Sequence, residues 1–238
     1  MNKLKTTIAL LVVVVIPFGI MIWTRVHQST GFAATELIVF PLLFGGSSLV
    51  LLVALKKYFL KEDLEDFNPI PGKWDHDIGW GLILTLLYFI LFFLERATLT
   101  GVLQFNPNRE LLGLILEMRD QPWLLILWFG PVLWIGIALY EELLRVFFLT
   151  SLWKWSQNTL WTISVIVLFS LMFGLAHWYQ GSYGIVTIFI KSWVAGYFYY
   201  KHKRLMPLVY AHVLYDGLQV AALLLTTLND QGWLDSNN

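Results

Sequence analysis

The chain has 238 residues, of which 58% are hydrophobic and only 13% are charged, and its mean hydropathy is +0.66. A soluble domain carries about 25% charged residues, so this composition indicates an integral membrane protein. Lys and Arg balance Asp and Glu at 16 each, which argues against a nucleic-acid partner, and the absence of Cys excludes disulfides, thiolate metal sites and a cysteine nucleophile.

Apolar stretches of membrane-spanning length recur along the chain. A helix needs about 20 apolar residues to cross the hydrocarbon layer, so we expect an all-α, polytopic bundle of about seven transmembrane helices. The expected spans are residues 4–24, 32–55, 78–94, 123–151, 160–178, 183–200 and 205–228. The polar connection at 56–77 is typical of a turn between two spans, and residues 109–120 have the pattern of an amphipathic helix on the surface.

The loop lysines and arginines predict the orientation of the chain. Short loops rich in Lys and Arg stay on the cytoplasmic side, so we expect a cytoplasmic N-terminus and a C-terminus on the opposite side. The expected location is a prokaryotic cell membrane. The loops expected in the cytoplasm carry Lys3, Lys5, Lys56, Lys57, Lys61, Lys73, Lys154, Lys201, Lys203 and Arg204, and the opposite loops carry Arg25, Arg96, Arg109 and Arg119.

Ionisable residues inside the expected spans are the candidates for function. A charged side chain at the bilayer centre costs from ~2.5 to more than ~10 kcal/mol, so such groups are paired or used. The main group consists of Glu141, Glu142, Arg145, His177, His212 and Asp216. Two further charges are Glu36, which lies close enough to a span end to reach the surface, and Lys191, which needs a partner such as Asp216 or a backbone carbonyl.

The spacing of these residues indicates which side chains share a helix face. Glu141 and Arg145 are four residues apart, while Glu142 is three residues from Arg145 and can also pair with it. A structural ion pair is the simplest interpretation, but two acids with one arginine leave one carboxylate for general base catalysis. His212 and Asp216 are also four apart, so the acid can orient the imidazole.

Three ordered motifs resemble a known membrane protease family. They are Glu141-Glu142-Leu143-Leu144-Arg145, Phe173-Gly174-Leu175-Ala176-His177 and His212-Val213-Leu214-Tyr215-Asp216. Together they resemble the intramembrane endopeptidases that include type II CAAX prenyl proteases and the Abi and bacteriocin-processing proteins. We therefore expect one membrane domain over 1–238, in which 1–121 are scaffold spans and 122–228 form a CAAX-protease-like core.

The resemblance implies a reaction and a site. It implies that Glu141 and His177 activate a water to attack a peptide bond, while His212 and Asp216 stabilise the oxyanion and Glu142 with Arg145 support the helix. The expected substrate is a peptide or lipid-modified protein cut near the cytoplasmic face, with membrane lipid as the other partner. We favour a glutamate-type enzyme without a cofactor; if zinc is present, its ligands would be Glu141, His177, His212 and Asp216.

The chain departs from the family pattern at the arginine. The family usually has Glu-Glu-x-x-x-Arg, whereas this chain has Glu-Glu-x-x-Arg. Aligning the glutamates, which we favour, leaves Arg145 shifted by one residue; aligning the arginine places Tyr140 at the first glutamate and implies an inactive site. The alternative function is therefore a non-enzymatic membrane protein, either an inactive relative that protects a partner or a proton-coupled carrier.

One geometric condition must hold for the motifs to meet. In a simple fifth span, His177 lies near the outer end, away from the depth of Glu141 and His212. We therefore predict that the turn at 180–184 dips inside the protein, where irregular backbone is tolerated when it is shielded from lipid.

Overall fold

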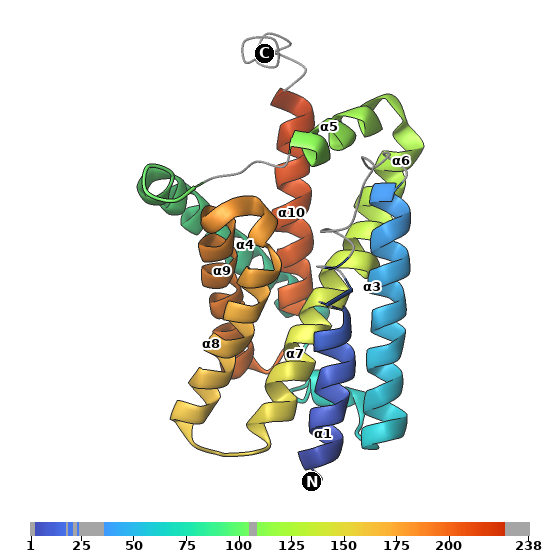
Figure 1. Ribbon diagram of the computed structural model, residues 1–238, viewed down its shortest axis with the longest axis vertical. Coiled ribbons are helices and arrows are strands. Elements are labelled where there is room, and N and C mark those ends of the chain that lie inside the picture. The colour runs from blue at the N-terminus through green and yellow to red at the C-terminus, as the bar shows by residue number, and fades with distance from the viewer. Residues whose placement is uncertain (1–2, 18, 21–22, 24–35, 105–108, 227–238) are drawn as a thin grey trace.

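The computed structural model describes residues 3–17, 19–20, 23, 36–104 and 109–226, and within these residues all regular elements are helices (Figure 1). The all-α prediction is therefore confirmed. The longer elements are α1 (Lys3–Leu10) with η1 (Leu11–Val15), α3 (Glu36–Ala54) with η2 (Leu55–Leu60), α4 (Trp74–Leu99), α5 (Arg109–Glu117), α6 (Pro122–Leu127) with η5 (Trp128–Leu139), α7 (Tyr140–Trp153), α8 (Thr159–Ala176), α9 (Gly181–His202) and α10 (Met206–Thr226). Short 3₁₀ helices are η3 (Leu64–Phe67), η4 (Met118–Asp120) and η6 (Trp178–Gln180).

Among the described residues, 5 helical segments are long and apolar enough to cross a membrane. They are Glu36–Leu60, Trp74–Leu99, Pro122–Trp153, Thr159–Ala176 and Met206–Leu225. These agree with five of the expected spans, and α9 occupies the expected sixth. The first expected span lies partly outside the described residues, so the count of seven stays a prediction.

The helices pack around one continuous element that crosses the bundle. Figure 1 shows α6, η5 and α7 running diagonally from the end near α5 towards the end that carries the N-terminus. α10 packs against α4 and η5, α3 packs against η5, and α8 forms an antiparallel hairpin with α9. The two motif helices α7 and α10 therefore share a common neighbour in η5.

The crossing element is interrupted just before its acidic residues. Gly130 has φ −88° and ψ −113°, outside the helical region, and Pro131 follows it. Proline lacks a backbone N–H and clashes with the preceding turn, which is the usual cause of a kink. The chain continues as a π-helix to Leu139, and regular α-helix resumes as α7 at Tyr140. Glu141 and Glu142 therefore lie in the first turn of α7.

α3 approaches η5 so closely that the two backbones touch through glycines. A Cβ on Gly45 would lie 2.0 Å from the carbonyl oxygen of Gly136, and a Cβ on Gly136 would lie 2.8 Å from the carbonyl oxygen of Pro41. Small residues allow this kind of approach between membrane helices. The contact fixes the stretch that leads directly into α7.

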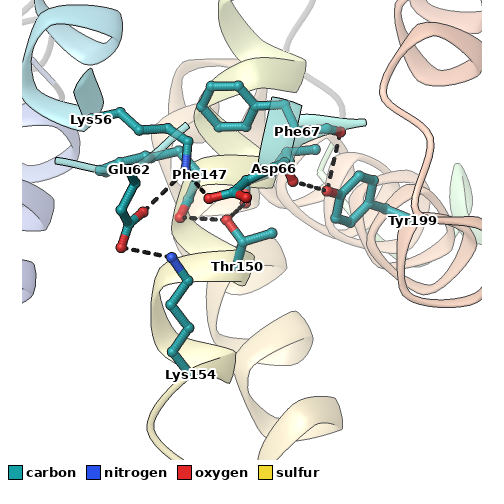
Figure 2. A network of polar contacts seen from close by, with 9 residues as sticks. Lys56, Glu62, Asp66, Phe67, Phe147, Thr150, Lys154 and Tyr199 are labelled. Atoms are coloured by element: carbon teal, nitrogen blue, oxygen red, sulfur yellow. Dashed lines mark hydrogen bonds and ion pairs between the residues drawn. The ribbon is translucent and has the colours of Figure 1, made fainter. Parts of the chain in front are cut away.

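Charged residues join the elements at the N-terminal end of the bundle (Figure 2). Lys56 is only 1% exposed and donates to Glu62 and Asp66, each at 3.0 Å, while Lys154 at the end of α7 contacts Glu62 at 2.6 Å. Burial raises the pKa of Glu62, but the hydrogen bonds and charges of Lys154 and Lys56 outweigh it and hold this pKa below its ordinary value of 4.5. The expected connection at 56–77 is present but shorter, over 61–73, because η2 continues to Leu60 and α4 begins at Trp74. It is clamped to α7 through Glu62 and Lys154.

The amphipathic helix predicted at 109–120 is present as α5 and η4. Its apolar residues Leu114, Ile115 and Met118 are buried, and Figure 1 places α5 beside the upper part of α10. The helix therefore covers one end of the bundle with its apolar face.

We predict that Gly45→Ala destabilises the fold, because the added methyl group would meet the backbone of Gly136. Overpacking of this kind costs about 1–3 kcal/mol and should lower the midpoint of thermal unfolding in detergent micelles. Gly46→Ala is the matched control, since nothing lies within 4 Å of a Cβ there. Equal midpoints for the two variants would show that α3 and η5 do not touch at Gly45.

Candidate active site

One cavity of about 600 Å³ lies between the helices and contains all six residues of the main ionisable group. Its polar lining from the motifs is Glu141, Glu142 and Arg145 on α7, His177 after α8, and His212 and Asp216 on α10. The predicted convergence of the three motif segments therefore occurs, whereas the chemical role of each residue stays a prediction.

His177 reaches the cavity from the turn that follows α8. α8 ends at Ala176, η6 follows, and α9 begins at Gly181, whose φ of 78° suits glycine. Figure 1 shows this turn beside the middle of α10, below the level of α5, and Tyr179 and Gln180 line the cavity. The turn is only partly enclosed, because no residue of η6 is buried and Trp178 is 45% exposed. Regular helix already begins at Gly181, so the predicted irregular dip at 180–184 is not observed.

The hydrogen bond of His177 fixes which ring nitrogen carries a proton. Its Nδ1 lies 2.8 Å from the carbonyl oxygen of Phe173. A carbonyl only accepts, so Nδ1–H is the donor, and in a neutral imidazole the lone pair is then on Nε2. The ring also packs between Phe173 and Tyr179, with ring centroids 5.1 and 5.9 Å away. His177 therefore offers a basic nitrogen in a fixed orientation.

His212 lies among three carboxylates. Its Nδ1 is 2.8 Å from Oε1 of Glu142, and its Nε2 is 3.2 Å from Oδ2 of Asp216 and 3.7 Å from Oε2 of Glu141. The expected pairing of His212 with Asp216 is therefore present. The bond to Glu142 links α7 to α10 and holds the imidazole from its far side.

Arg145 supports the site through Glu142. Its guanidinium bonds the other oxygen of Glu142, and the two side chains are only 3% and 4% exposed. The same guanidinium lies over the rings of Phe169 and Phe173, at 5.6 and 5.3 Å. Of the two pairings that the sequence allowed, the structure has Glu142 with Arg145, and Glu141 is left facing His212 and the cavity.

The sequence missed several groups of the cavity. The bond between Glu142 and His212 joins residues 70 positions apart, which no helical spacing could indicate. The direct partner of Lys191 is Glu95 on α4, which the sequence did not indicate, while the expected partner Asp216 interacts with Lys191 electrostatically. Glu95 was overlooked because the expected span ended at residue 94, whereas α4 continues to Leu99. The rings of Tyr88 and Tyr215, 5.6 Å apart, complete this wall.

The candidate zinc ligands are engaged with other protein groups. Among the described residues, no group of three or more His, Asp or Glu side chains is placed to hold a metal ion. Both ring nitrogens of His212 face carboxylates, at 2.8 and 3.2 Å, and Nδ1 of His177 faces the carbonyl oxygen of Phe173. The choice between a glutamate-type enzyme and a zinc enzyme stays a prediction.

Comparison with known proteins supports the motif analysis. A protein-family model described as type II CAAX prenyl endopeptidase, Rce1-like, matches residues 122–218. The match covers all three motifs, confirms the resemblance that they indicated, and supports an intramembrane endopeptidase of the CAAX-protease type. Neither the curated proteins nor the solved structures gave a match.

Proposed function

We propose that this protein is an intramembrane endopeptidase that hydrolyses a peptide bond of a peptide or lipid-modified protein near the cytoplasmic face. The observation that carries the proposal is the placement of a glutamate and two histidines from three helical segments in one cavity. Amide hydrolysis needs a base for water and donors where negative charge develops, and this set of side chains supplies both.

Glu141 and His177 are the proposed pair that activates water. Glu141 is 24% exposed although it lies within the bundle, because it faces the cavity. His177 keeps its Nε2 lone pair for this task because Phe173 takes the Nδ1 proton. A water between the two side chains would lose a proton as its oxygen attacks the carbonyl carbon, and this proton would then pass to the leaving amine.

His212 is the proposed donor to the oxyanion. In this role the ring of His212 carries a proton on both nitrogens, as the carboxylates at each nitrogen favour. Nδ1–H donates to Glu142, and Nε2–H points towards Asp216 and Glu141 at the cavity. A donor held in advance stabilises the tetrahedral intermediate at little reorganisation cost. Asp216 accepts the Nε2–H of His212, and this N–H turns to the oxyanion when substrate binds.

The engagement of Arg145 supports the alignment in which the two glutamates match the family and the arginine is shifted. Arg145 bonds Glu142 from its shifted position, and Tyr140 then precedes the motif. This arrangement favours an active site over an inactive relative. Nothing in the cavity specifically favours a proton-coupled carrier.

The cavity suits a short peptide attached to an apolar group. Its volume of about 600 Å³ is within the range of ligand sites, which is about 300–1,000 Å³. Apolar residues of α3, α5 and η5 form one part of the lining: Leu37, Phe40, Pro41, Leu114, Ile115, Trp128 and Ile137. We propose that 122–228 form the catalytic core, that 1–121 are the scaffold, and that the N-terminus is cytoplasmic in a prokaryotic membrane.

We predict that Glu141→Gln, His177→Ala and His212→Ala each reduce peptide cleavage by about 10²-fold or more, because each removes a proton-transfer group or an oxyanion donor. Activity should be measured on the full chain in lipid vesicles, with thermal unfolding as the folding readout. Glu65→Gln and His76→Ala are matched controls at exposed positions. Retained turnover in Glu141→Gln would remove the proposed base.

We propose that the reaction needs no metal. Prolonged treatment of the purified protein with a zinc chelator should leave the cleavage rate unchanged, and elemental analysis of the active protein should find no stoichiometric zinc. Activity that is lost with chelator and restored by added zinc would replace the glutamate-type mechanism with a zinc-dependent one.

A further inference from the structure

A second polar group lines the same cavity, outside the catalytic motifs. Lys191 on α9 bonds Glu95 on α4, and the lysine is 15% exposed while the acid is 4% exposed. Both side chains line the cavity, and the lysine is the more exposed of the two.

The ammonium of Lys191 keeps donors available for a ligand. A lysine has three N–H donors, and the bond to Glu95 uses one of them. Its further interactions in the described part of the chain are with the face of the Tyr215 ring, 5.8 Å from the ring centroid, and with the carboxylate of Asp216, which attracts it electrostatically. Beside it, Oγ of Ser192 is buried without a hydrogen-bond partner in the structure. Buried polar groups are rarely left unmatched, and this hydroxyl can donate to an oxygen of a ligand.

Arg145 also lines the described part of the cavity, but its guanidinium is not accessible to a ligand. It is 3% exposed, bonded to Glu142 and stacked on two phenylalanine rings. A negatively charged group that enters the cavity therefore meets Lys191 first.

Packing alone does not account for the pair. The desolvation cost of two buried charges cancels much of their attraction, and apolar side chains of similar volume often stabilise a fold as well or better. α4 and α9 would therefore pack without these charges, which points to a use for the ammonium group.

The pair lies within reach of the catalytic residues. Tyr215, which Lys191 contacts, precedes Asp216 on α10. A cavity of about 600 Å³ is roughly 10 Å across, which corresponds to about three residues of extended peptide. A group bound at Lys191 would thus lie a few residues from the bond that is cut.

We propose that Lys191, held in place by Glu95, is a specificity-determining residue that binds a carboxylate of the substrate. This inference rests on the proposed peptide hydrolysis. The carboxylate belongs either to the C-terminus of the peptide or to an acidic side chain, and both would accept the free N–H donors of Lys191 by charge-assisted hydrogen bonds.

The test uses the full chain in lipid vesicles and two pairs of fluorescent peptides. One pair differs only in a C-terminal carboxylate against a carboxamide, and the other differs only in an Asp against an Asn near the C-terminus. Loss of a charged hydrogen bond corresponds to about 10- to 100-fold in affinity. For one of the pairs, wild-type protein should therefore show a KM lower by this factor for the carboxylate peptide, with kcat nearly unchanged.

The variants separate binding from folding. Lys191→Met should abolish this discrimination and Lys191→Arg should keep it. Because Lys191→Met leaves the charge of Glu95 uncompensated, the double variant Glu95→Gln/Lys191→Met is the main test, since it removes both charges together. Discrimination that persists in the double variant overturns the assignment of Lys191.

Peptide binding to Glu141→Gln, measured by fluorescence anisotropy, separates this inference from the proposed function. Cleavage by wild-type protein, with discrimination that does not depend on Lys191, overturns only the carboxylate site. Absence of all cleavage, with Lys191-dependent binding of the carboxylate peptide, overturns the endopeptidase and keeps the carboxylate site.

Discussion

The site depends on the carboxylate of Glu142, which bonds Arg145 with one oxygen and His212 with the other. This group joins α7 to α10 at a place where an unpaired charge would be costly to bury. With both partners present, the acid is satisfied, the arginine is neutralised, and the imidazole is held in one orientation. Glu141, one residue earlier on the same turn, then remains free to face the cavity.

Several backbone contacts and turns position the carboxylate of Glu142. The break at Gly130 and Pro131 and the close contact of Gly45 with Gly136 set the path of the chain immediately before α7. The charged cluster of Lys56, Glu62 and Lys154 fixes the other end of α7 (Figure 2). The turn after α8 (Figure 1) carries His177, which lines the same cavity as His212 and Asp216 of α10. These separate constraints together position the three motif segments around one cavity.

Much of this architecture was accessible from the sequence because hydropathy and helical spacing are local properties. The span from Pro122 to Trp153, the amphipathic α5, and the facing of His212 and Asp216 follow from apolar runs and from residues four apart. Pairings between distant helices were not accessible in this way. Glu142 with His212 and Glu95 with Lys191 connect positions that no helical spacing relates. Glu95 was also missed because the expected span ended at residue 94, whereas α4 continues to Leu99.

The most direct test of the account is whether α8 and α10 face one another across the cavity in the membrane. The natural chain has no Cys, so paired cysteines can be placed at His177 and Asp216 and treated with a short bifunctional thiol reagent. We expect rapid bridging of this pair and none of a control pair at Leu171 and Leu218, which are exposed on the outside of the same helices. Two accessible thiols at His177 and Asp216 that label separately and never bridge would contradict a shared catalytic cavity.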